Sequence, residues 1–124
     1  MDVDQLLKRY AAGERDFRGV NLNNADLSQA KLNLANLSRA DLSWANLSGS
    51  SLGGANLSQA KLSQTNLAGA NLVHANLQGA VLRGANLKQA NLHWANLMEA
   101  DLSQANLLEA SFQRATLPDG TLLD

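Results

Sequence analysis

Residues 35–44 read Ala35-Asn36-Leu37-Ser38-Arg39-Ala40-Asp41-Leu42-Ser43-Trp44, two successive copies of one five-residue unit. Each unit contains a small residue, a polar residue, a large apolar central residue, and two more that we call the first and second corner residues. The central residue recurs at every fifth position from Phe17 to Leu122. Such a repeat at a fixed period decides the architecture before any local helix or strand prediction does.

A period of five fits neither standard element of secondary structure. On an α-helix, successive central residues would be rotated by about 140° and would circle the helix. In a flat strand, an odd spacing would send them to opposite faces. All of them can be buried only if the chain turns about once per unit, with the central and small residues pointing to a common axis. The sequence therefore predicts a solenoid.

The units Ala25-Asp26-Leu27-Ser28-Gln29 and Ala85-Asn86-Leu87-Lys88-Gln89 resemble the pentapeptide-repeat proteins, whose consensus is A-(N/D)-L-x-x. The resemblance covers about 22 consecutive units in one register. It implies an all-β solenoid, the right-handed quadrilateral β-helix, with four units in each coil and roughly five and a half coils in this chain. Residues twenty positions apart are then expected to stack in columns along the rod.

Two surface features follow from this stacking. Most central residues are preceded by Asn or Asp, and we expect the stacked amides, such as Asn36 and Asn56, to hydrogen-bond from coil to coil. Six of the nine glycines occupy the second corner position, where a type II turn requires positive φ. These glycines are Gly19, Gly49, Gly54, Gly69, Gly79 and Gly84.

Residues 1–13 break the repeat and follow helical spacing instead. Asp2 or Asp4 is placed to cap the start of a helix and Gly13 its end. We expect residues 1–13 to form a capping helix over the N-terminal end of a β-helix at 14–124, the two making one domain. A partner-binding or membrane-surface helix is the alternative, disfavoured by short length and mixed charge. The apolar face of the helix comprises Val3, Leu6, Leu7, Tyr10 and Ala11.

At the other end the repeat decays. Pro118 lacks a backbone donor, and Asp119-Gly120 is a turn signal, so regular stacking is expected to stop there. Either the final loop folds over the last layer, or Leu122 and Leu123 form an end-to-end contact with a second copy. The similar fluoroquinolone-resistance proteins associate through their C-terminal ends, but with a longer C-terminal segment. Both a monomer and an end-to-end homodimer remain open.

Composition narrows the functional classes. The chain has no Cys and a net charge of −1, with ten Lys plus Arg against eleven Asp plus Glu. It starts without a basic and apolar leader pattern and has no apolar run of membrane-spanning length. We therefore expect a cytoplasmic protein without a membrane partner. No basic run is interleaved with aromatics, so nucleic-acid binding is not expected either.

The apparent chemical motifs do not indicate catalysis. The run Gly49-Ser50-Ser51-Leu52-Gly53 matches a nucleophile elbow, but it lies within the repeat register and lacks a strand-turn-helix context. His74 and His93 fall at the same corner of adjacent coils, yet no Asp, Glu or Cys in that column supplies a third metal ligand. A β-helix filled with Leu and Ala implies no catalytic cleft. We expect no enzyme activity, no metal and no cofactor.

One corner of the predicted coil stands out as a partner-binding candidate. The corners after central residues 32, 52, 72, 92 and 112 carry the densest set of bulky side chains outside the core. Trp94 among charged and aromatic neighbours has the composition of an interface hot spot. The alternative is that an exposed Trp on a narrow rod simply covers its neighbours. The candidate patch comprises Leu34, Val73, His74, His93, Trp94 and Arg114.

These observations predict a non-enzymatic protein-interaction or scaffolding module with an unidentified protein partner. One alternative, suggested by the resemblance, is a DNA mimic that interacts with a type II topoisomerase. The near-neutral charge disfavours it, because a DNA mimic needs a strongly negative surface. The other alternative is a structural unit that assembles end to end.

Overall fold

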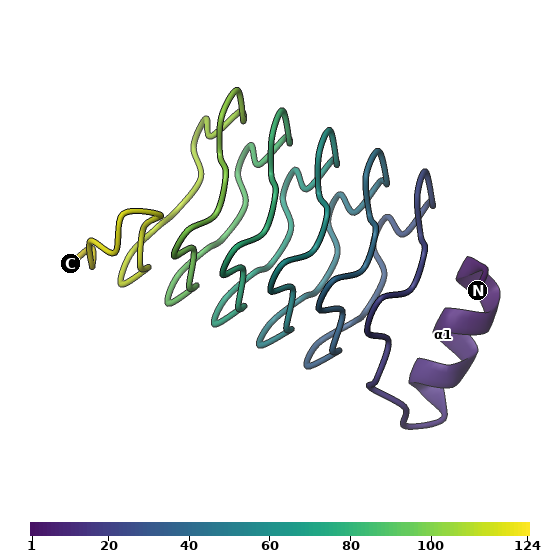
Figure 1. The fold of residues 1–124 in the computed structure, drawn as a ribbon. Helices are drawn as coiled ribbons and strands as arrows, with labels where there is room; N and C mark the ends of the chain where they lie inside the picture. The colour runs from purple at the N-terminus through teal and green to yellow at the C-terminus, as the bar shows by residue number, and fades with distance from the viewer.

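The five-residue period produces a backbone that turns after every unit and closes a coil after four units. In the computed structural model, which describes all 124 residues, the polar residue of each unit forms a parallel bridge with the polar residue twenty positions later. These bridges run from Asp16–Asn36 to Asn96–Thr116 and replace continuous strands. Figure 1 shows the coils stacked as a rod, with helix α1 (Val3–Ala11) at one end and the C-terminus at the other. The predicted four-unit coil is confirmed.

The core is a column of central residues along the axis of the rod. Every central residue from Phe17 to Leu97 is at most 2% exposed. The small position lies inside with it, and the alanines from Ala30 to Ala100 in this position are at most 9% exposed. The period of five is therefore explained by two inward positions per unit, because the turn at the corners sends the other three outward.

In the middle of the rod, a unit with Asn or Asp in the polar position satisfies its five backbone N–H groups in a fixed way. In the unit 45–49, the small residue donates to the preceding central carbonyl, and the polar residue donates to the previous coil. The central and second corner residues donate to the next coil. The first corner N–H of Ser48 has no backbone acceptor and donates to Oδ1 of Asn46 at 3.0 Å. The polar position thus completes the hydrogen bonding of its own turn.

This pattern corrects the expectation that asparagine amides bond from coil to coil. The oxygens of Asn36, Asn56 and Asn76 each accept from the backbone N–H two residues later, within 3.0–3.1 Å. The physical reason is that a short side-chain acceptor here satisfies a donor that the ladder leaves free, as in an Asx-turn. Where Ser51 replaces Asn, Asn33 of the previous coil accepts from Gly53 N–H instead, at 2.8 Å.

The corners require the left-handed backbone conformation. All six second-corner glycines have φ between 64° and 68°, as predicted. Non-glycine residues at the same position, from Asn24 to Arg114, also have positive φ, between 57° and 63°. None of these residues is β-branched, in keeping with the steric cost of that conformation.

Helix α1 covers the N-terminal end of the rod. Asp2, not Asp4, is the N-cap: its carboxylate accepts from Gln5 N–H at 2.8 Å, and the Gln5 side chain accepts from Asp2 N–H at 3.0 Å. Leu6 is fully buried, whereas Ala11, predicted for the same face, is exposed. The Tyr10 hydroxyl donates to the Asn33 carbonyl at 2.8 Å and ties the helix to the first coil. No helix in the structure has the length and apolar character needed to span a bilayer.

Candidate functional site

Three of the six predicted patch residues form a stacked array on one corner of the rod. His74, Trp94 and Arg114 occupy the second corner position in three successive coils. The rings of His74 and Trp94 stack with centroids 5.6 Å apart and an interplanar angle of 17°. The Arg114 guanidinium lies 5.4 Å from the Trp94 ring centroid. The twenty-residue spacing thus brings an imidazole, an indole and a guanidinium into one ridge.

The ridge has a defined chemical character. Because His74 precedes Trp94 by one coil and Arg114 follows it by one, both faces of the indole are flanked along the rod. Trp94 nevertheless remains 53% exposed, so its edges face solvent. Stacked aromatics and a cation over an indole restrict one another's rotamers and are mutually stabilising. The ridge therefore offers a pre-ordered edge rather than an open ring face.

The other three predicted residues are separate from the ridge or less accessible. Leu34 is 69% exposed but lies two coils before His74, with its side chain over Gly54. A Cβ added at Gly54 would lie 2.7 Å from Leu34 Cδ2, so the glycine makes room for that leucine. Val73 and His93 are half-buried in the neighbouring first-corner column. The structure therefore reduces the candidate patch to a three-residue ridge and an outlying leucine.

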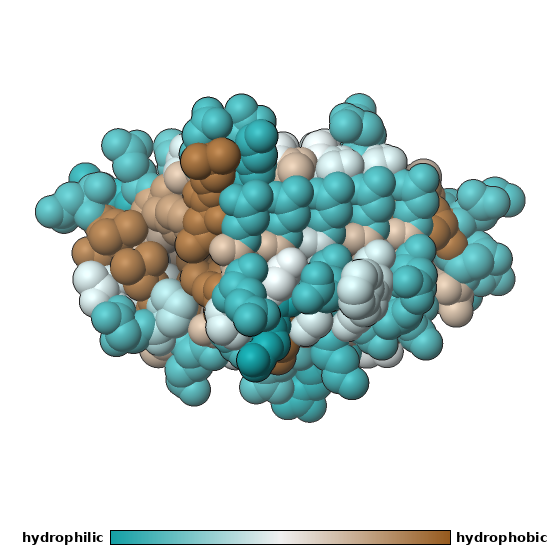
Figure 2. Space-filling model, turned by 90° about the horizontal axis from the view of Figure 1, so that it is seen from above, coloured by the Kyte–Doolittle hydropathy of each residue, from teal (hydrophilic) through white to brown (hydrophobic).

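Exposed apolar side chains also gather elsewhere, at the C-terminal end of the rod (Figure 2). The central residue Leu107 is 38% exposed, and the adjacent Leu108 is 57% exposed. Of the two residues predicted for an end-to-end contact, Leu122 is 62% exposed, and Leu123 is half-buried. Leu123 N–H donates to the Ala115 carbonyl at 2.9 Å, so the final segment folds back along one side of the last coil. The rest of that layer stays open.

The open layer also leaves backbone groups unpaired. In every earlier coil the central and second corner N–H groups donate to the following coil, but in the last coil no coil follows. Sequence reasoning identified the final leucines but not this row of donors, which is implied by the end of the repeat. The N–H groups without an acceptor belong to Leu102, Gln104, Leu107, Glu109, Phe112 and Arg114.

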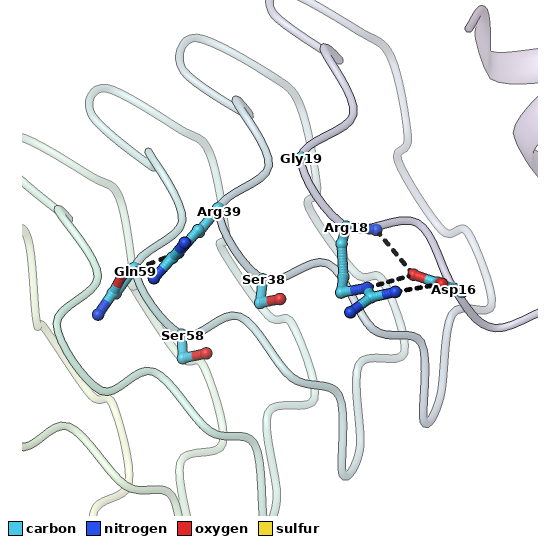
Figure 3. A pocket seen from close by; sticks show the side chains of 7 residues that line it. All are labelled: Asp16, Arg18, Gly19, Ser38, Arg39, Ser58 and Gln59. Atoms are coloured by element: carbon cyan, nitrogen blue, oxygen red, sulfur yellow. Dashed lines mark hydrogen bonds and ion pairs between the residues drawn. The ribbon is translucent and has the colours of Figure 1, made fainter.

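The only pocket is a shallow polar hollow of about 730 Å³ near the N-terminal end (Figure 3). By the twenty-residue register of the coils, it lies on a different side of the rod from the ridge. Two arginines, Arg18 and Arg39, flank it. The Asp16 carboxylate accepts two hydrogen bonds of 2.8 Å from Arg18, and these bonds lower the pKa of Asp16. This hollow was not predicted from the sequence. One feature of the sequence could have indicated it. Arg18, Ser38 and Ser58 occupy the same first corner position in successive coils, so two small residues follow a large one and leave a depression beside it. Its lining consists of Asp16, Arg18, Gly19, Ser38, Arg39, Ser58 and Gln59.

Solved structures with the same architecture include two from cyanobacteria. The pentapeptide repeat protein Rfr23 from Cyanothece 51142 is 34% identical to this chain, with a TM-score of 0.76, and the match covers 98% of this chain and 99% of that one. The pentapeptide repeat protein alr5209 from Nostoc PCC 7120 is 38% identical, with a TM-score of 0.61, over 92% of this chain and 78% of that one.

A more distant similarity is to QnrB1, a plasmid-mediated fluoroquinolone resistance protein, at 26% identity over 82% of this chain and 59% of that one. Its TM-score of 0.39 is too low to support a shared function. No curated protein sequence matches this chain. The family profile described as pentapeptide repeats matches the sequence in 8 copies, over residues 16–54, 50–89, 65–104 and 90–122. The chain belongs to the pentapeptide-repeat family.

Proposed function

We propose that this protein is a rigid, non-enzymatic interaction module that engages a protein partner through the ridge His74–Trp94–Arg114. The observation that carries the proposal is the stacking of these three side chains at an exposed corner, with Trp94 53% exposed. Tryptophan and arginine are enriched among the residues that contribute most to protein interfaces. A ridge that is already ordered loses less conformational entropy on binding than free side chains do.

The flanked indole favours a protein partner over a nucleic acid. Base stacking uses an open aromatic face. In the ridge, His74 and Arg114 flank the faces of Trp94, and only its edges remain available to a ligand. A partner would therefore pack apolar atoms against the indole edge or accept a hydrogen bond from its N–H.

The test compares two tryptophans in equivalent backbone positions. Trp94 and Trp44 both occupy second corner positions with φ of 63°, and both are more than half exposed. Trp94→Ala and Trp44→Ala therefore carry the same backbone cost. We expect proteins captured from lysate of the native host to include one that wild type and Trp44→Ala retain and Trp94→Ala loses. Equal capture by all three proteins would contradict the assignment of the ridge.

A second candidate function, end-to-end assembly, is favoured by the open C-terminal layer. The unpaired N–H of Leu107 follows the unpaired carbonyl of Ala105 by two residues on the same edge. A second copy turned end to end would face each donor with an acceptor and each acceptor with a donor, as in an antiparallel pair. Because α1 covers the other end, such pairing would stop at a dimer and not continue as a filament.

The assembly proposal is tested by solution mass. We expect wild type to show a concentration-dependent rise to twice the monomer mass in light scattering, and Leu107→Glu to remain monomeric. Leu34→Glu is the matched control, because Leu34 is an exposed leucine on the side of the rod. A wild-type protein that stays monomeric at its highest soluble concentration would refute assembly and leave the ridge proposal unaffected.

A further inference from the structure

The polar hollow near the N-terminal end lies beyond both proposed interaction surfaces. Its lining contains no apolar residue, and all seven lining residues come from the same side of the first three coils. Figure 3 shows Ser38 between Arg18 and Arg39, the Arg39 side chain directed toward Gln59, and Ser58 near Gln59 in the third coil. One aspartate and two arginines give the hollow a formal charge of +1.

Arg39 supplies the uncompensated charge. Its Nε donates to Gln59 Oε1 at 3.0 Å, which fixes the guanidinium along the rod. No carboxylate lies within ion-pair distance of it, since the only ion pairs are Arg18–Asp16 and Arg83–Asp101. Its two terminal nitrogens therefore remain free to donate to a ligand.

Arg18 is held in place and still has donors to spare. Its Nε and Nη2 donate to the two carboxylate oxygens of Asp16, each at 2.8 Å, and this two-point contact orients the planar guanidinium. A guanidinium has five N–H donors, so those directed away from Asp16 remain available. Asp16 thus positions Arg18 but also offsets its charge.

The floor between the arginines is small and polar. The Ser38 hydroxyl has no hydrogen-bond partner within the chain, although the backbone N–H of Ser38 donates to Asn36. The entrance above it is unobstructed at Gly19, where an added Cβ would meet no atom within 4 Å. A ligand could therefore approach the floor from solvent and find a free hydroxyl donor there.

We propose that this hollow binds the oxyanion of a phosphate monoester, seated over Ser38 between Arg18 and Arg39. A phosphate monoester carries about −1.5 to −2 charges near neutral pH and presents three acceptor oxygens. Those oxygens match donors on two separate guanidinium groups and one hydroxyl. A carboxylate, with two oxygens in one plane, suits a single guanidinium fork and uses this arrangement less completely.

The binding test is an NMR titration of the amide signals of the full chain. O-phosphoserine is the first probe, inorganic phosphate the second, and free glutamate the carboxylate comparison. We expect O-phosphoserine to give saturable shifts confined to residues around the hollow, and glutamate to bind more weakly. A phosphoserine peptide then separates a protein-borne phosphate from a free one: tighter binding than O-phosphoserine indicates the former, and equal binding the latter. The reporting amides are those of Arg18, Gly19, Ser38, Arg39, Ser58 and Gln59.

Two charge variants with opposite expected effects test the site itself. Arg39→Gln removes one charge-assisted donor and is expected to weaken O-phosphoserine binding about tenfold. Asp16→Asn removes the competing negative charge while keeping a side-chain oxygen, and it is expected to tighten binding. Arg83→Gln, at an arginine on another side of the rod, is the control and is expected to leave the affinity unchanged.

A third variant blocks the hollow without changing its charge. Second-corner side chains lean over the next coil: Gln59 Cγ, for example, lies 3.3 Å from where a Cβ at Gly79 would be. Gly19→Gln would extend over Arg39 in the same way, and glutamine is already accepted at this φ elsewhere in the chain. Gly69→Gln, at a corner with no atom within 4 Å of an added Cβ, is the matched control.

Binding reduced by Gly19→Gln and Arg39→Gln, unchanged by both controls and tightened by Asp16→Asn would support the site. Three results would overturn it: no saturable shift with O-phosphoserine, glutamate binding as tightly as O-phosphoserine, or equal weakening by Arg39→Gln and Arg83→Gln. The last result would mean that phosphate associates diffusely with the surface.

Discussion

Two polar residues, Ser50 and Thr65, occupy the inward small position, and their hydroxyl groups differ in hydrogen bonding. Thr65 is buried, and its Oγ1 donates to the Leu42 carbonyl of the previous coil at 2.7 Å. Ser50 is equally buried, but its Oγ has no hydrogen-bond partner. A buried hydroxyl without a partner has lost its contacts with water and gained nothing in return. Ser50 is therefore a local weakness in the core.

Replacing Ser50 with alanine is expected to stabilise the protein. Alanine fills the same position in most other units, and Ser50→Ala removes an unsatisfied polar group at little change in volume. We expect the free energy of unfolding to rise by about 1 kcal/mol, measured by urea denaturation. Thr65→Ala is the contrasting variant and is expected to lower it, because it removes a hydrogen bond and two buried heavy atoms. A loss of stability in Ser50→Ala would show that the serine hydroxyl is satisfied in solution.

The aspartates in the polar position link stability to acid pH. Hydrogen bonds from the Ser28 hydroxyl and backbone lower the pKa of Asp26, and those from Ser103 act likewise on Asp101. A folded-state pKa below the unfolded value of about 3.9 means that these carboxylates stabilise the fold above that pH. Their contribution is lost as the pH falls through the lowered folded-state pKa values.

Converting Asp26 and Asp101 together to asparagine is expected to flatten this acid dependence. Asparagine keeps the side-chain oxygen that accepts from the first corner N–H, as Asn46 does for Ser48. We therefore expect the double variant to lose less stability than wild type between about pH 4 and pH 2, in thermal melts recorded across that range. Parallel pH profiles for the two proteins would mean that other groups control acid unfolding.

At the level of the structural elements, the backbone conformation of the corners could be predicted from the sequence only in part. The glycines at the second corner position predicted positive φ, because only a residue without a Cβ adopts it freely. Nothing in the unit Ala85-Asn86-Leu87-Lys88-Gln89 marks Gln89 as left-handed, yet its φ is 60°. That conformation is imposed by the coil, whose inter-coil hydrogen bonds hold every corner alike. For the same reason the role of the asparagines was predicted wrongly: stacking was foreseen, but the unpaired corner N–H was not.

Substitutions at Gln89 test how much free energy this imposed left-handed conformation costs. A non-glycine residue in the left-handed region loses about 1–2 kcal/mol relative to the right-handed one, and β-branching makes this worse. We expect Gln89→Gly to match or exceed wild-type stability, and Gln89→Val to fall below it by about 1 kcal/mol or more. Chemical denaturation of the two variants gives the comparison. Equal stability would show that the corner relaxes to accommodate the valine.

At the scale of the whole molecule, one end of the rod is closed, and the other is open. The helical spacing of Val3, Leu6 and Leu7 predicted the helix that closes the N-terminal end. The loss of the repeat after Phe112 predicted that regular coils stop at the C-terminal end. The ridge was predictable because Trp94 and Arg114 are twenty residues apart. The hollow was not predicted. The small residues Ser38 and Ser58 after Arg18 indicated a low floor, but the direction of the Arg18 side chain is set by its ion pair with Asp16, which the repeat does not specify.

This asymmetry predicts the order in which the rod opens. In a stacked repeat each coil is stabilised mainly by its neighbours, so the ends fray before the centre. Leu6, fully buried, seals the first coil, whereas the amides of Leu102 and Leu107 have no acceptor at all. We expect hydrogen exchange to be fastest at Leu102 and Leu107, slower at Phe17, and slowest in the central coils around Leu62.

Leu6→Ala tests whether the helix supplies the protection of the first coil. Removing a buried leucine costs about 2–5 kcal/mol, and in a one-dimensional stack that cost falls mainly on the adjacent coil. We therefore expect exchange at Phe17 to accelerate by at least about tenfold, which corresponds to 1.4 kcal/mol, while the amide of Leu62 changes little. An equal acceleration at both amides would instead mean that all coils unfold together, and that the cap stabilises the whole rod as one cooperative unit.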